Sequence, residues 1–153
     1  MEDKQVISEI HVERYRYILQ QLNAANENVH RFLAIYQSLA TGIFGAGLAL
    51  FVGYRNWGVN VAIAHKGLIG LGCLLTLVAA FTVLLVISSV FSWLDYRKEE
   101  CALTNELVGP GFRSPPRIRN FVRWHETYIL GFISASTIAV WVLVYSFAIP
   151  NMR

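Results

Sequence analysis

Residues 67–93 limit what this chain can be more than any other stretch. They contain no charged residue and no proline, and most of them are apolar. As an α-helix that rises 1.5 Å per residue, the stretch would be about 40 Å long, which exceeds the roughly 30 Å hydrocarbon core of a bilayer. We therefore predict that residues 67–93 cross a membrane as a helix.

The composition of the whole chain agrees with a membrane protein. Of 153 residues, 55% are hydrophobic and only 15% are charged, and the formal net charge is +3. There is no basic run of the kind that binds nucleic acid, so we expect no nucleic-acid partner. The two cysteines, Cys73 and Cys101, lie on one predicted helix too far apart to form a disulfide bond with each other.

Two further apolar stretches, residues 38–54 and 128–149, contain no charged residue and are also predicted to span the membrane. No proline or glycine separates the first of them from the helical pattern before it, so we expect one rod over about residues 5–54. The second helix continues past the bilayer to Val108, where Gly109-Pro110-Gly111 ends it. The predicted fold is all-α, a three-span helical membrane protein with a cytosolic helical-hairpin stalk.

These boundaries predict a linear organisation in six segments. The first two are a cytosolic amphipathic helix (1–37) and the first span (38–54). An external loop (55–66) and the second span (67–93) follow. Residues 94–127 hold the helix extension, a Pro/Gly loop and a short interfacial helix over 117–127, and the third span is 128–149.

The distribution of basic residues predicts the orientation. Of the 13 lysines and arginines, the exceptions on the far side are Arg55, Lys66 and Arg153. The others flank the first span or lie between the second and third: Lys4, Arg14, Arg16, Arg31, Arg97, Lys98, Arg113, Arg117, Arg119 and Arg123. The positive-inside rule then places the N-terminus in the cytoplasm and the C-terminus on the other side of the membrane.

An apolar line runs along the predicted first helix with alternating steps of three and four residues, the spacing of a coiled-coil seam. Two interpretations remain open: the line joins copies of the chain, or it packs against the rest of its own chain. The line continues through Tyr36 and Leu39. Its stalk members are Tyr15, Ile18, Leu22, Ala25, Val29 and Phe32.

Small and hydroxylated residues in the spans suggest contacts between helices. Gly45, Ala49 and Gly53 recur every four residues, a spacing that lets helix backbones approach closely in lipid. Thr82, Ser89 and Ser92 share one predicted face of the second helix. That face could line a narrow pore in an oligomer, or its hydroxyls could bond within the bundle or to their own backbone.

Ion pairs are expected where the second helix leaves the membrane. An antiparallel hairpin places the charged residues that follow Trp93 near the level of Arg31. We therefore expect Arg31 to pair with Asp95 or Glu99.

The sequence contains no pattern typical of catalysis or cofactor binding. It lacks G-x-S-x-G, P-loop and H-E-x-x-H motifs. His11, His30, His65 and His125 have no metal-ligand partner at helical spacing. No Asp, Glu, Lys, Arg or His occurs within the spans, which disfavours proton pumps and ion-coupled carriers. We expect neither an enzyme nor a cofactor.

The long helix ERYRYILQQLNAANENVHRFL (residues 13–33) that leads into the first span, and the exit WLDYRKEE (93–100) of the second, resemble the SLATT-type small bacterial membrane proteins. The chain is also similar to RipA-like octameric membrane proteins. The resemblance covers about residues 8–108, and the third span departs from the two-span pattern. It implies an inner-membrane homo-oligomer, associated with nucleotide-signalling defence systems, that permeabilises the membrane when triggered.

The expected function is an oligomeric inner-membrane pore or membrane-disrupting effector, gated from the cytosolic side, in bacterial antiphage defence. The alternative is a non-conducting membrane scaffold that recruits a cytosolic partner. The partners implied are the lipid bilayer, further copies of the chain, and a cytosolic protein or a signalling nucleotide.

Overall fold

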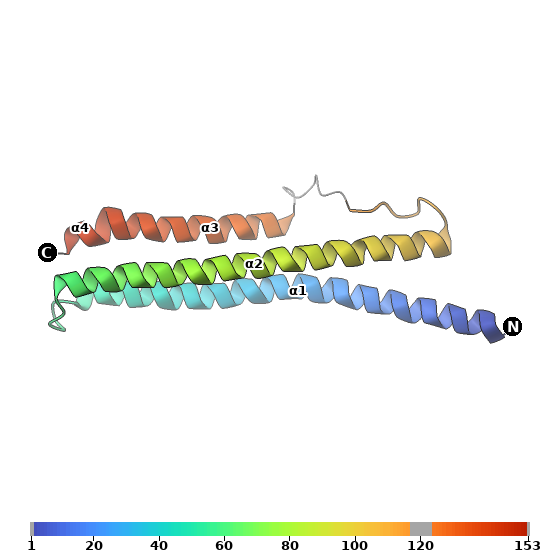
Figure 1. Cartoon of the computed structure of the whole chain (residues 1–153), viewed down its shortest axis with the longest axis horizontal. Helices are drawn as coiled ribbons and strands as arrows, with labels where there is room; N and C mark the ends of the chain where they lie inside the picture. The colour runs from blue at the N-terminus through green and yellow to red at the C-terminus, as the bar shows by residue number, and fades with distance from the viewer. Residues whose placement is uncertain (1, 117–123, 153) are drawn as a thin grey trace.

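The computed structural model of the chain describes residues 2–116 and 124–152. Within them the fold is all-α: α1 is Glu2–Gly53, α2 is Val61–Val108 and α3 is His125–Leu143 (Figure 1). One π-helical segment, η2 (Val144–Ala148), and a final short helix, α4 (Ile149–Asn151), extend α3. All three helical regions are long and apolar enough to cross a membrane.

The three helices lie side by side, with α2 in the middle (Figure 1). α1 and α2 form a long antiparallel hairpin, and α3 covers only the half of α2 nearest the α1–α2 connection. The other half of the hairpin projects as two helices, the predicted stalk. The N-terminus lies at the stalk end, and the C-terminus lies at the connection end.

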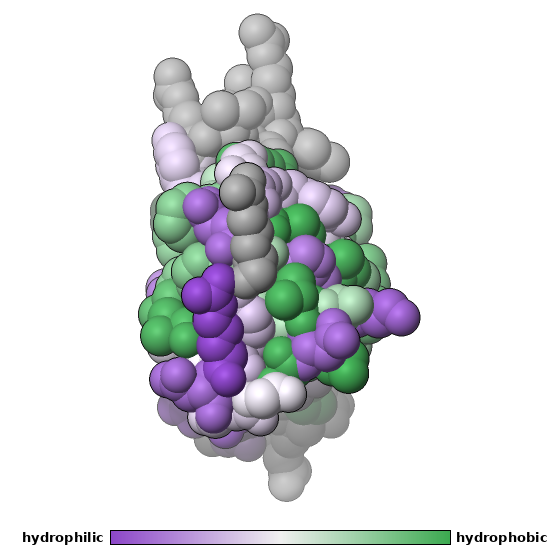
Figure 2. All heavy atoms as spheres, turned by 90° about the vertical axis from the view of Figure 1, so that its left-hand side faces the viewer, coloured by the Kyte–Doolittle hydropathy of each residue, from purple (hydrophilic) through white to green (hydrophobic). Residues whose placement is uncertain are grey.

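The connection between α1 and α2 is shorter than the sequence predicts. The Val59 amide donates to the Tyr54 carbonyl (2.9 Å), and the Asn60 side chain accepts from the Ala62 amide (2.8 Å). Because Asn60 caps the first turn of α2, residues 61–66 are helical rather than part of the external loop predicted over 55–66. Figure 2 looks onto this end, where hydrophilic and hydrophobic residues both reach the surface.

Buried residues form three clusters along the hairpin. The cluster at the connection end joins α1, α2 and the end of the chain, the middle cluster joins all three long helices, and the stalk cluster joins α1 to α2. Their members are, in that order, Tyr54, Ala64, Leu68, Val144 and Met152; Tyr36, Leu75, Ala79 and Ile133; and Ile18, Leu22 and Leu103.

The outer surface of the bundle is strongly apolar. Large side chains of all three helices stand exposed there, including Leu48 on α1, Leu77 and Phe81 on α2, and Phe132 and Ile138 on α3. A soluble monomer rarely exposes so continuous an apolar surface, whereas lipid covers it without cost. The surface therefore agrees with the membrane assignment.

The ends of the last two helices agree with the sequence in part. α2 ends at Val108, as the glycine–proline turn predicts. The interfacial helix predicted over 117–127 lies mostly outside the described residues, and α3 already begins at His125. Because Pro150 would crowd the Ser146 carbonyl in a regular α-helix, the wider π turn of η2 just before it is physically reasonable.

Candidate functional site

The most concentrated polar group in the described part of the chain lies in the stalk around Glu100. The side chain of Glu100 is fully buried. Its Oε2 accepts from Arg97 Nη1 at 2.8 Å, and its Oε1 accepts from Arg113 Nη1 at 2.6 Å. Since an unpaired buried carboxylate costs several kcal/mol, the two guanidinium groups are what allows Glu100 to stay inside.

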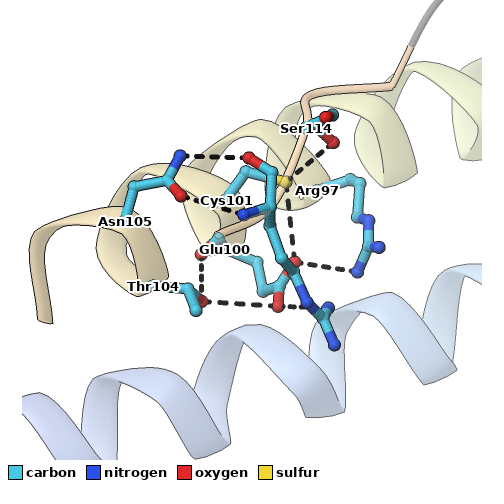
Figure 3. A network of polar contacts seen from close by, with 7 residues as sticks. Arg97, Glu100, Cys101, Thr104, Asn105 and Ser114 are labelled. Atoms are coloured by element: carbon cyan, nitrogen blue, oxygen red, sulfur yellow. Dashed lines mark hydrogen bonds and ion pairs between the residues drawn. The ribbon is translucent and has the colours of Figure 1, made fainter. Parts of the chain in front are cut away.

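The same group holds the loop after α2 against the helix. Asn105 pairs with the backbone of Arg113, because its Nδ2 donates to the carbonyl (3.1 Å) and its Oδ1 accepts from the amide (3.0 Å). The Cys101 thiol donates to the Ser114 carbonyl (3.5 Å). Figure 3 shows these side chains of α2 meeting the returning loop beside α1. Thr104 Oγ1 donates to the Glu100 carbonyl at 2.7 Å. We call these residues the stalk clasp: Arg97, Glu100, Cys101, Thr104, Asn105, Arg113 and Ser114.

The stalk clasp also sets the chemistry of Cys101. Burial raises the pKa of this thiol, and the nearby Glu100 carboxylate raises it further. A protonated thiol is a poor nucleophile, so Cys101 is a structural rather than a reactive cysteine in the closed stalk.

The ion pair between the two stalk helices differs from the one expected. Glu99 pairs with Arg14 at 2.6 Å, and Asp95 pairs with Lys98 on its own helix at 3.3 Å. The expectation that Arg31 would meet Asp95 or Glu99 is corrected by these contacts. The difference in partners is caused by the short connection. Because residues 61–66 are helical, the residue of α2 that faces a given residue of α1 lies about two helical turns from the predicted one.

The predicted seam on α1 is buried against α2 of the same chain. Ile18, Leu22, Ala25 and Val29 are buried, and Tyr15 and Phe32 are partly buried. The structure therefore uses this face for the packing of the hairpin itself, the second of the two interpretations.

A second polar group joins α1 to α3 within the membrane region. The hydroxyl of the buried Tyr36 hydrogen-bonds with Ser136 Oγ (2.8 Å) and Thr137 Oγ1 (3.3 Å). In lipid, a polar side chain has no water to bond with and must find such partners in neighbouring helices. The sequence pattern included Tyr36 only as an apolar member of the seam and did not indicate this role.

Trp141 joins α3 to α2 in a similar way. Its Nε1 donates to Thr76 Oγ1 at 2.9 Å, and its ring lies over Gly72, where an added Cβ would come within 3.0 Å of the ring carbons. The absence of a side chain at Gly72 is therefore what lets the indole approach α2.

The three hydroxyls proposed as a pore lining do not share an open face. Thr82 is buried and donates to the Val78 carbonyl of its own helix (2.8 Å). Ser89 lines a groove between the helices, and Ser92 is exposed. The bonding of Thr82 matches the alternative interpretation, in which such hydroxyls satisfy their own backbone.

The small residues proposed as a packing face are divided between two environments. Gly45 and Ala49 are exposed on α1, and a Cβ added at Gly45 would meet no atom within 4 Å. Gly53 instead lies against the ring of Trp57 in the connection. Within one chain, Gly45 and Ala49 thus remain open to a neighbour.

No group of three or more His, Cys, Asp or Glu side chains that could hold a metal ion occurs among the described residues. In comparisons with known proteins, no family model, curated protein or solved structure matches the chain. The fold and the contacts therefore define its class: helical membrane proteins with three candidate spans and a two-helix stalk.

Proposed function

We propose that this protein is a homo-oligomeric pore or membrane-disrupting effector of the bacterial inner membrane, controlled from its cytosolic stalk. The observation that carries the proposal is the open, small-residue face of α1. Thr41, Gly42, Gly45 and Ala49 are exposed on it, and a Cβ added at either glycine would meet no atom within 4 Å.

A pore needs more than one copy of this chain. The middle of the bundle is filled by Tyr36, Leu75, Ala79 and Ile133, so water has no path through it there. Small residues on α1 would let the helices of neighbouring copies approach closely. Exposed backbone and the Thr41 hydroxyl would then provide a weakly polar line between copies, which suits a narrow and weakly selective pathway.

The continuity of α2 supports the proposed control from the stalk. The helix runs from Val61 to Val108 without a break, so a force on the stalk clasp reaches the membrane region through one rigid element. A cytosolic protein or signalling nucleotide that opens the stalk clasp is the proposed trigger. The resemblance to SLATT-type proteins supports this role in antiphage defence.

The test compares Gly45→Leu with Gly131→Leu. Both glycines have open space around them in one chain, but Gly45 lies on the proposed contact face and Gly131 lies on α3. We expect the wild type and Gly131→Leu to be oligomers that release dye from liposomes, and Gly45→Leu to be a smaller particle with little release. A monomeric wild type, or a Gly45→Leu variant that still assembles and leaks, would contradict the proposal.

A second candidate, a non-conducting scaffold that recruits a cytosolic partner, is favoured by the surface of the stalk. Ile10, Tyr17, Leu107 and Phe112 are large apolar residues exposed beyond the level at which α3 begins. Exposed apolar groups outside lipid are typical of protein-contact surfaces. Oligomers that never release dye, together with recruitment that Tyr17→Ser and Leu107→Ser abolish, would establish the scaffold in place of the pore.

A further inference from the structure

We propose that the groove where the stalk meets the membrane region binds a phospholipid through a primary ammonium headgroup. The groove has a volume of about 390 Å³. It is independent of the α1 face on which the proposed pore depends. It lies among α1, α2 and the first residues of α3, and its lining residues are Ala25, Asn26, Val29, Ser89, Val90, Trp93, Trp124, His125 and Glu126.

The depth of the groove matches the headgroup region of a bilayer. α3 begins there, with Trp124 as the residue before its first turn. Trp93 on α2 meets Trp124 edge to face, with the ring centroids 5.6 Å apart. Tryptophan is enriched at membrane–water interfaces, because its ring is apolar and its N–H is polar.

The lining of the groove favours a cation. Glu126 is its acidic residue, and the side chain of Glu126 is only 13% exposed. Among the described lining residues there is no lysine or arginine. A carboxylate that is itself largely shielded from water and lies beside tryptophan rings attracts an ammonium group through both charge and the negative ring faces.

The side chain of Glu126 is only partly committed to protein partners. His125 Nδ1 lies 3.4 Å from its Oε2, and the His125 ring stacks on that of His30, with centroids 5.6 Å apart. These contacts position Glu126, and within the described residues its Oε1 has no ion-pair partner. Asn26 and Ser89 line the same groove, so their side-chain oxygens and Glu126 Oε1 supply three acceptors for the N–H donors of a primary ammonium.

The floor of the groove explains why we assign a lipid rather than a free amine. Ala25, Val29 and Val90 are buried apolar residues beneath the polar rim. An apolar floor next to the spans suits the glycerol and upper acyl carbons that a lipid brings with its headgroup. A small soluble amine has nothing to place there.

The test measures lipids retained by the purified full-length protein by native mass spectrometry, after reconstitution with equal amounts of phosphatidylethanolamine, phosphatidylcholine and phosphatidylglycerol. We expect phosphatidylethanolamine to be retained preferentially. Glu126→Gln should weaken its binding by about tenfold, since it removes a charge-assisted hydrogen bond. Glu27→Gln, which neutralises an exposed carboxylate that does not line the groove, should leave binding unchanged.

A second pair of variants tests the volume of the groove instead of the charge of Glu126. Ser89→Leu fills the groove from α2, whereas Ser92→Leu adds the same side chain at an exposed position of the same helix. We expect only Ser89→Leu to release the lipid. Equal retention of the three lipids, preference for phosphatidylglycerol, displacement by an equimolar amount of soluble phosphoethanolamine, or equal behaviour within either variant pair would overturn the proposal.

Discussion

Glu99 and Glu100 are adjacent carboxylates that tie α2 to two different parts of the molecule. Glu99 reaches Arg14 on α1, at the surface of the stalk. Glu100 points inward and holds Arg113 of the returning loop. An exposed pair such as Glu99–Arg14 contributes at most about 1 kcal/mol. Loss of a partner from buried Glu100 costs more, because it leaves a buried charge poorly compensated.

We predict that Arg113→Ala opens the stalk clasp and exposes Cys101. In a Cys73→Ser background, Cys101 is the only cysteine of the chain, and its reaction with a water-soluble maleimide reports the opening. Loss of a charge-assisted hydrogen bond, about 1.5–3 kcal/mol, should speed this reaction by about tenfold or more. Arg16→Ala, which breaks the exposed pair with Glu13, is the control and should leave the rate unchanged; equal rates for both variants would contradict the role of the clasp.

A pair of glycines on α2 provides a second prediction at this scale. Gly72→Ala places a methyl group against the Trp141 ring, which its hydrogen bond to Thr76 holds in place, whereas a Cβ added at Gly70 meets nothing within 4 Å. We expect Gly72→Ala to lower the unfolding free energy of the detergent-solubilised protein by about 1–3 kcal/mol and therefore to lower its melting temperature. Gly70→Ala should be neutral or slightly stabilising, so a Gly72→Ala variant that melts no earlier than Gly70→Ala would refute the close packing.

Single residues of this kind are hard to identify in the sequence. Glu100 lies in a run of charged residues that any amphipathic helix could place in water, and its burial depends on Arg113 of the returning loop as well as on Arg97. The partners of Tyr36 are about one hundred positions away, so local spacing cannot reveal them. Both depend on contacts with another segment of the chain, a loop for Glu100 and α3 for Tyr36, which periodicity does not encode.

At the scale of whole helices, the sequence was more informative. The extent of α1, the end of α2 at Val108 and the buried face of α1 all follow from apolar periodicity and from the glycine–proline turn, whereas α2 begins six residues before the predicted start at residue 67. Which residues of α1 and α2 face each other could not be predicted from the sequence, because this register depends on the length of the connection. A single cap, Asn60, lengthened α2 and changed the ion-pair partners of the stalk.

The packing of the stalk can be tested with two leucines one turn apart. Leu103 is 3% exposed and packs on Ile18 and Leu22, whereas Leu107 is 53% exposed. We expect Leu103→Ala to destabilise the stalk by about 2–4 kcal/mol and Leu107→Ala by less than about 0.5 kcal/mol. Hydrogen exchange of the stalk amides of α1 measures the difference, and similar protection in the two variants would argue against this register.

For the whole molecule, three spans place the two ends of the chain on opposite sides of the membrane. We predict that green fluorescent protein at the N-terminus fluoresces in the cytoplasm and that alkaline phosphatase at the C-terminus is active outside it, as the basic residues require. Fluorescence with an inactive phosphatase, or an active phosphatase without fluorescence, would place both ends on one side and contradict three spans. Inactivity of both reporters, with activity regained when the two reporters are exchanged between the ends, would contradict the orientation while the three-span fold stands.

The order of the chain has a consequence for synthesis. The apolar line of the α1 stalk, with Ile18 and Leu22, is complete before either span of the hairpin has left the ribosome. Leu103, which packs on these residues, is synthesised only after the second span, so the stalk is the last part of the hairpin to pack. Until then the apolar line of α1 is exposed on the nascent chain. During this interval chaperones, proteases or a neighbouring nascent copy can bind it.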